Sequence, residues 1–588
     1  MHDRRLVAGG AAFALVMVAA IALLFIAPRV AASGLTGLVQ QQLGRGVSVK
    51  GGIHLDFSPL SLRLEDVALA GADARDDSFV MARSAVVPVS VGQLFGAAPR
   101  LAEIAVAEPD IALIVNERGE ASWDFPDAAP GGPLRIAVEQ GRFRYFDARN
   151  NQSMELSRVD GRLDLRADGG VSFAGTAVIN GRLVRIDADL KSLARVNADG
   201  SPLELALVAD DGNASFSGRL STAKVMSLAG PVSLASTTPG PGLRLLGLPV
   251  PDGAVVVGPI AIDGALDSAG RAFAIRNATL GIGALRAAGE LGADLRNDHP
   301  KLQAKLVADT LWLDPLLPAA GAKDGEWGRL PLPFALLRTI DLETAIDARS
   351  LSYGGFTAGA SRLSATLAGG KLELSGGARL AGDGTLTFTL TADATSLPPA
   401  VGLDIAASDT EVQPLLAALV GVNQLSGKGS FAAKLTAAGT TQEELAGMLK
   451  GTASITLGEG RIEGADFTGL MLAARQNTLE GWSDAPGGTP FTSLSGEATI
   501  ADGIASFRGV EIAGPVTSFT LEGLIDVLRK GIAVSVTGMS NGQPLLPVAV
   551  IAKGLWARPK IFADVPSIIT TPEGGIPGMQ DAAPAQGN

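Results

Sequence analysis

Residues that could perform chemistry are few in this sequence, and their spacing assembles no site. The three histidines are His2, His54 and His299, and none has a second histidine three or four residues away with an acidic companion, as metal sites require. A serine triad would have to recruit His54 or His299, and no Gly-x-Ser-x-Gly turn is present. The absence of cysteine excludes disulfides, thiolate metal sites and cysteine nucleophiles. We therefore expect no metal site and no cofactor.

Adjacent carboxylates and one glycine-rich segment are the remaining candidates. Neighbouring residues of a strand point to opposite faces, so carboxylate pairs read as solvated turns rather than as a general acid and base; these pairs are Glu65-Asp66, Asp76-Asp77 and Asp210-Asp211. The segment Gly427–Ala432 fits Gly-x-Gly-x-x-Ala but runs into a strand-like sequence. As a phosphate loop it fails, because Val422 replaces the leading glycine and Gly429 replaces the Mg²⁺-binding hydroxyl. The sequence predicts that the protein is not an enzyme.

Composition points to a large folded protein made of strands. Of 588 residues, 47% are hydrophobic and 18% charged, which excludes a largely disordered chain. Aromatic residues make up only 5%, whereas glycine occurs 74 times, a mixture that suits many short strands joined by tight turns. The net charge of −12 and the lack of a basic stripe argue against nucleic acid as a partner.

The N-terminus contains the strongest physical signal. The segment Leu6–Ala27 has no charged residue, and as a helix it would extend about 33 Å, enough for the hydrocarbon core of a bilayer. Arg4 and Arg5 precede it, so the positive-inside rule predicts a cytoplasmic N-terminus, a single-pass inner-membrane anchor and a periplasmic body. A cleaved signal peptide ending before Ser33 is the alternative, and the length of the apolar segment favours the anchor.

The rest of the chain shows the two-residue period of strands with one apolar face. Three apolar residues alternate with threonine in one segment, and three alternate with polar or charged residues in another: Leu386, Phe388 and Leu390, and Val184, Ile186 and Leu190. We expect these six to line an apolar groove on an antiparallel sheet. The cores of ordinary β-sandwiches would give the same alternation. Short helices are predicted at Gln413–Leu419, Gln442–Leu449 and Phe467–Leu479.

Several segments, in this order, resemble the AsmA family of Gram-negative inner-membrane proteins. They are Gly44–Ala70, Glu108–Phe125, Leu311–Pro318, Pro331–Leu351, Glu411–Leu419, Gly451–Phe467 and Thr489–Gly514. Ser122 stands where the family pattern has Asn before a tryptophan, and the stretch Gly200–Asn297 matches poorly.

The resemblance implies a transmembrane helix followed by an elongated, curled antiparallel β-sheet groove with a few short helices. It also implies a role in outer-membrane biogenesis, with phospholipid carried along the groove between the two membranes. Expected partners are membrane lipids and outer-membrane or periplasmic assembly proteins. The alternative is a non-enzymatic assembly factor for targeting or insertion of outer-membrane proteins. The expected regions are a tip and anchor (1–28), AsmA-like N-terminal (29–200), middle (201–310) and C-terminal (311–565) β regions, and a disordered tail (566–588).

Overall fold

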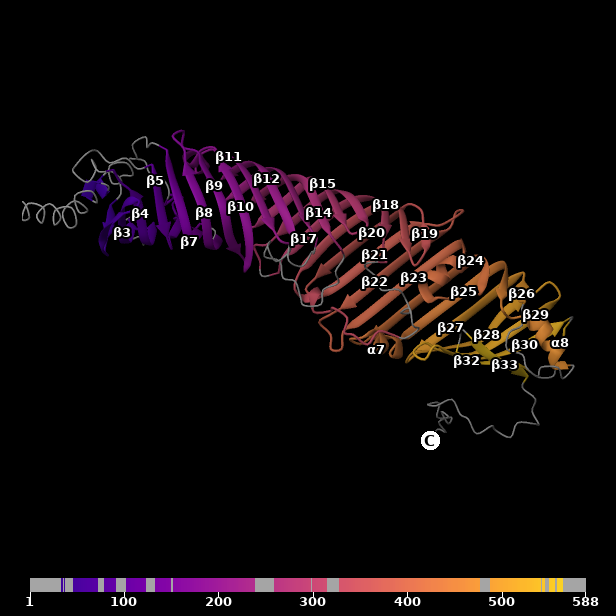
Figure 1. Ribbon diagram of the computed structural model, residues 1–588. Helices are drawn as coiled ribbons and strands as arrows, with labels where there is room; N and C mark the ends of the chain where they lie inside the picture. The colour runs from indigo at the N-terminus through magenta and orange to yellow at the C-terminus, as the bar shows by residue number, and fades with distance from the viewer. Residues whose placement is uncertain are drawn as a thin grey trace, which may run out of the picture. The chain divides into compact units, whose positions relative to one another are not determined.

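The computed structural model describes most of the body of the protein (Figure 1). The described residues are 33–34, 36–37, 46–71, 79–90, 102–122, 133–149, 152–237, 258–297, 299–314, 327–475, 487–540, 542–544, 549–555 and 558–563. The predicted anchor and tail lie outside them. Among these residues, no helix has both the length and the apolar character needed to cross a bilayer.

The protein is mainly β, as predicted: 67% of the described residues lie in strands and 7% in helices. The chain forms two compact units, residues 1–307 and 308–588, and the boundary falls within β17 (Lys301–Trp312). The division into five regions stays a prediction.

The first unit is built on strands that pair mostly with their neighbours in the sequence. β1 and β2 lie along different parts of β3, and the ladder then runs from β3 to β16. The strands are β1 (Val47–Val49), β2 (Ile53–Phe57), β3 (Leu60–Leu69), β4 (Val80–Pro88), β5 (Glu103–Ala107), β6 (Asp110–Val115), β7 (Leu134–Asp147), β8 (Gln152–Leu165), β9 (Val171–Ile179), β10 (Arg182–Leu190), β11 (Ser201–Ala209), β12 (Gly212–Ser221), β13 (Ser227–Ser236), β14 (Ile260–Ala269), β15 (Ala272–Ile282) and β16 (Leu285–Asp294). A short helix, α4 (Leu193–Val196), follows β10.

One part of this ladder corrects the expectation of a purely antiparallel sheet. β5 and β6 both pair with β7 in parallel, while every other pairing given for the first unit is antiparallel. The reason is the connection after β6, which returns the chain to the edge where β5 began before β7 starts. A two-residue alternation is common to both pairings, so the sequence pattern did not distinguish them.

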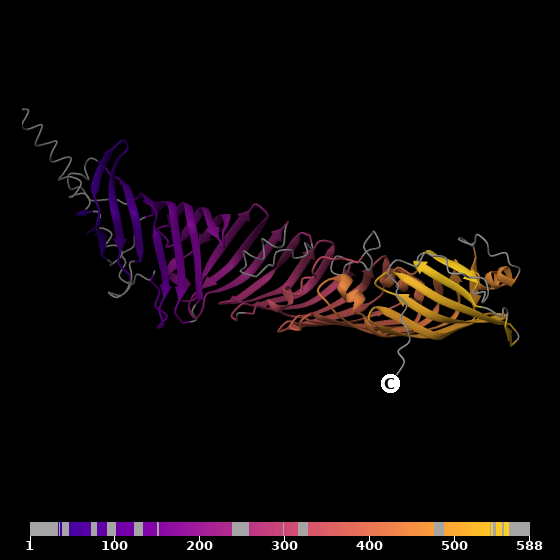
Figure 2. The same ribbon diagram turned by 90° about the horizontal axis from the view of Figure 1, so that it is seen from below.

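The described part of the second unit has an antiparallel ladder and three α-helices (Figure 1). Its strands are β18 (Asp341–Tyr353), β19 (Phe356–Ala358), β20 (Ser361–Ala368), β21 (Lys371–Arg379), β22 (Thr385–Asp393), β23 (Ala400–Glu411), β24 (Leu425–Ala438), β25 (Lys450–Glu463), β26 (Gly488–Phe491), β27 (Ser493–Ala501), β28 (Ile504–Ala513), β29 (Thr517–Asp526), β30 (Gly531–Ser540), β31 (Gln543–Pro544), β32 (Val550–Leu555) and β33 (Arg558–Ala563). Figure 2 shows that these strands follow a curved path rather than a flat one. The predicted helices are confirmed as α6 (Val412–Val420), α7 (Gln442–Gly447) and α8 (Phe467–Arg475), and a 3₁₀ turn, η2, spans Leu336–Arg338.

A row of residues with positive φ bends adjacent strands of the first unit. Asp66 of β3, Glu108 between β5 and β6, Gln140 of β7 and Arg158 of β8 have φ between 47° and 54°. The register shifts beside Gln140 and Arg158, as it does at β-bulges, which bend and twist a strand. Beyond the bend lie β6, residues 141–147 of β7 and residues 152–156 of β8, which we call the roof.

The roof covers part of the same sheet. Phe143 and Leu156 of the roof pack in one apolar cluster with Val184 and Ile186 of β10 and with Leu207 of β11. A second cluster joins Val115 and Tyr145 of the roof to Leu193 of α4 and to Met226, which follows β12. In this part of the first unit, two layers therefore enclose a dry core.

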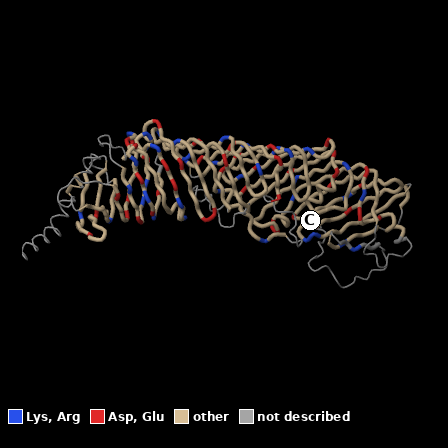
Figure 3. The backbone as a smooth tube through the Cα atoms, turned by 45° about the horizontal axis from the view of Figure 1, so that its top comes forward, with Lys and Arg blue, Asp and Glu red and all other residues tan. Residues whose placement is uncertain are grey.

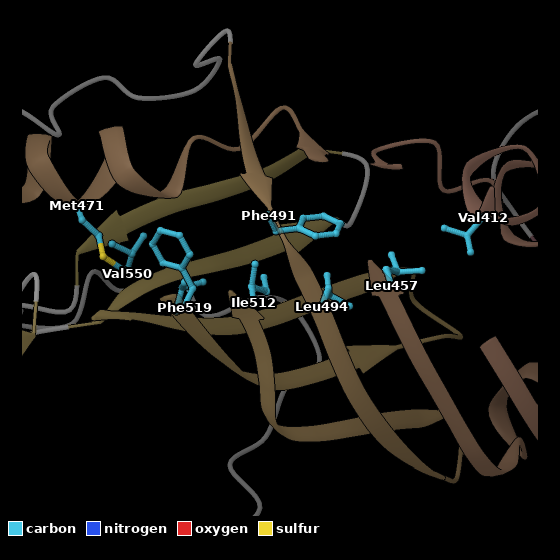
Figure 4. Packing of buried hydrophobic residues seen from close by; sticks show 9 residues of the cluster. Val412, Leu457, Met471, Phe491, Leu494, Ile512, Phe519 and Val550 are labelled. Carbon is cyan, nitrogen blue, oxygen red and sulfur yellow. The ribbon is translucent and has the colours of Figure 1, made fainter. Parts of the chain in front are cut away.

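The main core of the second unit lies where helices cover the last strands. Val412 of α6 and Met471 of α8 pack with Leu494, Ile512 and Phe519 of the sheet (Figure 4). The rings of Phe467 and Phe519 meet edge to face, with centroids 5.5 Å apart. The rest of the apolar face of this unit is less covered, and it contains three of the predicted groove residues.

Candidate functional site

β22 presents the three predicted groove residues of the second unit on one face. Leu386 is buried, whereas Phe388 and Leu390 are only half-buried, and Thr387 and Thr391 on the other face are exposed. This alternation places the apolar residues of the strand together, as the sequence predicted. Two of the three keep substantial solvent contact.

The antiparallel register continues this apolar face across four strands. Leu390 lies between Leu374 of β21 and Leu403 of β23, and Leu403 in turn lies opposite Leu435 of β24. A second row runs from Phe388 through Ile405 and Ala433 to Ala453 of β25. We call these two rows the floor; its members are Leu374, Phe388, Leu390, Leu403, Ile405, Ala433, Leu435 and Ala453, of which all but Ile405 are half-buried. The floor contains no charged side chain.

The opposite face of the same strands is polar. Asp404 of β23 lies beside Thr389 of β22 and Lys434 of β24, and Asp404 and Lys434 are exposed. On β18 and β20, Arg362 donates to Asp347 at 2.6 Å on this face, with both side chains more than half exposed. Acidic and basic residues are interspersed along the described strands (Figure 3). The sheet is thus water-facing on one side and apolar but incompletely covered on the other.

An irregular segment, residues 327–338, closes one edge of the floor; we call it the strap. The Trp327 indole donates to the carbonyl oxygens of Val527 and Leu528, both at 3.1 Å, and the ammonium of Lys530 lies 5.1 Å from the ring centroid. Further along, the Leu332 amide donates to the Thr440 carbonyl at 2.8 Å.

The middle of the strap packs on the ends of the floor strands. Phe334 is buried against Ala392 and Ala394, and Leu332 and Leu337 pack against the same cluster. The sequence Gly321–Pro333, with Trp327 and a Leu-Pro-Leu-Pro run, predicts a loop between two larger units. Its described part, Trp327–Pro333, is irregular, and its contacts lie within the second unit. The strap gives the floor an apolar wall along this edge.

Helix α6 lies at the other edge. Val412 and Leu415 are buried, and Leu416 packs with the cluster that includes Leu457 of β25. The helix ends at Gly421, which has a left-handed φ of 73°. Its amide donates hydrogen bonds to carbonyl oxygens of the last turn, which is the pattern of a glycine C-cap. Together, the floor, the strap and α6 form what we call the trough.

Glycine beneath an aromatic ring shapes the floor. A Cβ atom on Gly376 would lie 2.6 Å from the Cε1 and Cζ atoms of Phe388, so the ring lies against the bare backbone of the neighbouring strand. Such aromatic coverage of strand glycines stabilises sheets. Phe388 therefore contributes a flat surface to the floor rather than a side chain projecting from it.

The groove residues predicted in the first unit lie elsewhere and are covered. Val184 and Ile186 are 1% and 7% exposed beneath the roof, while Leu190, closer to the sheet edge, is half-buried. Here the β-sandwich interpretation of the alternation fits better than the open groove. Past the roof, the same face of β13 and β14 is again half-buried, with Leu234 and Ile262 among its residues.

Sequence reasoning overlooked most of the floor. Leu403 and Ile405 alternate with Gly402 and Asp404 in the same way as the residues that were selected, so this signal was available. The role of Gly376 depends on its register against Phe388, which the sequence does not reveal.

The groups that could do chemistry remain dispersed. His54 lies 3.7 Å from Glu65 on the exposed face of β2 and β3, His299 is exposed, and Asp211 pairs with Arg182. No cluster of three metal-ligating side chains occurs in the described part of the chain. A cavity of about 810 Å³ lies beside the polar face, and its Lys371 and Lys450 are ion-paired with Asp393 and Asp502. That the protein is not an enzyme stays a prediction.

Comparison with known proteins bears on the strands that build the trough. Residues 273–509 match the AsmA family. This stretch runs from β15 into β28 and contains the whole floor, the strap and α6. The predicted resemblance is confirmed over this range, which also includes residues 273–297 of the stretch Gly200–Asn297 that resembles the family poorly. The segments Gly44–Ala70 and Glu108–Phe125 lie outside it. No curated protein and no solved structure matches the chain.

Proposed function

We propose that the protein is an inner-membrane-anchored periplasmic protein that carries phospholipid along the trough during outer-membrane biogenesis. The AsmA match suggests a role in outer-membrane biogenesis or in lipid handling. The observation that supports the finer proposal is the floor: a charge-free apolar face, half-buried, between two apolar walls.

Acyl chains suit such a surface for physical reasons. Each buried methylene stabilises binding by about 0.8 kcal/mol, so even partial burial of a chain along several strands gives substantial affinity. The floor offers leucine, isoleucine and alanine but no charged partner, so a headgroup would stay at the open side in water. A flexible chain also adapts to an uneven floor that has few aromatic anchors.

The proposed location relies on the N-terminal sequence. The uncharged segment Leu6–Ala27 behind Arg4 and Arg5 favours an anchor with its body in the periplasm. The lack of cysteine is compatible with an oxidising compartment.

Site-specific photo-crosslinking in cells tests the proposal. A photoreactive residue at Leu390 or Leu403 should give phospholipid adducts, whereas the same residue at Thr387 or Thr391 on the polar face should give none. Thr387 and Thr391 lie on the same strand as Leu390, and Leu403 lies opposite Leu390 on the next strand. Probes and controls therefore occupy nearly the same part of the sheet and differ mainly in the face they lie on. Adducts only to neighbouring residues of the same chain at Leu390 and Leu403 would show that the face is closed and would overturn the proposal.

The assembly-factor alternative has one supporting observation. β33 pairs only with β32 among the described strands, so its outer edge offers backbone groups to a client strand. Photoreactive residues on β33 that crosslink outer-membrane proteins, together with no lipid at Leu390, would favour this function instead.

A further inference from the structure

The roof reaches across the sheet it grows from. The register places Leu134 of β7, Leu165 of β8 and Leu190 of β10 near one edge of the sheet, and β12 ends at this edge with Ser221. β7 itself ends at the opposite edge with Asp147. Yet Arg149, two residues later, donates to the carbonyl oxygens of Thr222 and Ala223. The roof must therefore pass over the apolar face of the intervening strands.

The contact at the far edge includes a polar junction centred on Arg149, which we call the clasp. The Arg149 guanidinium donates to both oxygens of Asp147, at 2.9 and 2.7 Å, and to the two carbonyls, each at 3.0 Å. Asp147 is fully buried and Arg149 is 17% exposed. Beside it, Asn197 after α4 donates to the Gly119 carbonyl at 3.5 Å. The clasp is the charged bond between the roof and the hairpin that follows β12.

The other side of the roof is a line of bends. Glu108, Gln140 and Arg158 lie on neighbouring strands where the ladder shifts, so these strands could pivot about a common line. Beneath the roof, Val184, Ile186 and Leu207 continue the apolar face that is half-buried on β13 and β14. The line of bends thus lies on one side of the covered apolar surface, and the clasp lies on the other.

We propose that the roof is a gate, held closed by the clasp, whose opening about the line of bends exposes the face around Ile186 to the same lipid cargo. The identity of the cargo rests on the proposed function; the gate itself does not. In the closed state, acyl chains reach the uncovered face of β13 and β14 but are excluded from β9, β10 and the covered part of β11. Opening would lengthen the apolar face by these strands.

Distances between spin labels test the gate in the full-length protein in detergent. Arg118 on the roof side and Lys224 on the β12–β13 connection are both exposed, and cysteines at these positions would be the only ones in the chain. The wild-type background should give mainly one short distance. Arg149→Gln should raise the ratio of long to short distances about tenfold, the change expected from roughly 1.4 kcal/mol of lost charge-assisted hydrogen bonding.

Arg144→Gln is the matched control. Arg144 donates to Asp110 at 2.9 Å within the roof and does not reach the far edge, so its loss should leave the distance unchanged. If Arg149→Gln prevents folding, seen as loss of the strand signal in circular dichroism, Asp147→Asn removes the charge while keeping the side chain's size. A wild-type distance distribution in the folded clasp variants would overturn the gate.

Photo-crosslinking at Ile186 separates the gate from its cargo. We expect phospholipid adducts at Ile186 in Arg149→Gln and not in Arg144→Gln. Longer distances without lipid at either Ile186 or Leu390 would support the gate and count against lipid as cargo. Lipid at Leu390 with unchanged distances would support the proposed function and reject the gate.

Discussion

The trough of the second unit and the roofed strands of the first have the same sequence pattern and opposite surroundings. On β22, Phe388 and Leu390 are half-buried, whereas on β10 Val184 and Ile186 are nearly inaccessible. The alternation fixes which residues share a face in both places. What covers that face depends on the bends at Gln140 and Arg158, which turn the roof back over the first sheet.

The difference separates stability from binding. Apolar area covered by the chain itself contributes to folding by about 25 cal/mol per Å². The floor residues of the second unit have gained only part of that contribution, so a ligand can supply the rest. We therefore expect substitutions under the roof to affect mainly folding and substitutions on the floor to affect mainly cargo.

The largest expected effect comes from placing a charge on each face. Ile186→Asp should destabilise the first unit by roughly 4 kcal/mol or more, because an unpaired carboxylate would be buried. Leu390→Asp should cost the second unit about 1–2 kcal/mol, because its carboxylate can reach water. Pulse proteolysis in urea, with mass spectrometry of fragments from each unit, measures the two losses.

Thr387→Asp is the control for this comparison, since Thr387 is exposed on the polar face of β22. It should change the urea midpoint little and leave lipid adducts at Leu403 intact, whereas Leu390→Asp should abolish them. Equal destabilisation by Ile186→Asp and Leu390→Asp would show that the floor is as closed as the roofed core.

A smaller effect should follow from filling two glycines of these faces. A Cβ on Gly175 of β9 would lie 2.3 Å from the carbonyl oxygen of Asp160, and backbone cannot easily move away. A Cβ on Gly376 would meet the ring of Phe388, which can rotate into the open trough. Gly175→Ala should therefore cost roughly 2–3 kcal/mol and Gly376→Ala about 1 kcal/mol.

The same proteolysis measures both alanine variants. Gly376→Ala should also alter the yield of lipid adducts at Leu390, because the displaced Phe388 ring would occupy part of the floor. A greater loss of stability at Gly376 than at Gly175 would mean that Phe388 is held as firmly as a core ring.

Local periodicity predicted the strands and the short helices well, because both depend on neighbouring residues. At Leu390 and Ile186 the alternation indicated which residues share a face, but not whether that face is open or covered. The parallel pairing of β6 with β7 was missed because it depends on the long return of the chain after β6. The roof was missed because it depends on bends at Glu108 and Gln140, non-glycine residues that carry no obvious signal for positive φ. The sequence predicted the strap only as a loop, because the hydrogen bond that holds it joins Trp327 to Val527, 200 residues later in the chain.

The smallest expected effect is a difference between the clasp and the strap in how their stability depends on pH. Burial raises the pKa of Asp147, but the hydrogen bonds from Arg149 and its positive charge lower that pKa by more, so the net pKa is below the ordinary 3.8. Burial, with the charge of Asp147, raises the pKa of Tyr145 to about 12, so this hydroxyl stays neutral throughout.

A depressed pKa of the Asp147 carboxyl stabilises the closed clasp above about pH 3.8, and this stabilisation is lost as the pH falls through the pKa of the folded state. The strap is bound mainly by the neutral Trp327 indole and by backbone amides, which do not titrate there. Its ion pair between Arg329 and Glu443 is exposed to water, so protonation of Glu443 should weaken the strap little. Hydrogen exchange, corrected for the intrinsic rate at each pH, should therefore lose protection around Arg149 on acidification before it loses protection around Leu332. Simultaneous loss at both places would indicate general acid unfolding and would remove the distinction between clasp and strap.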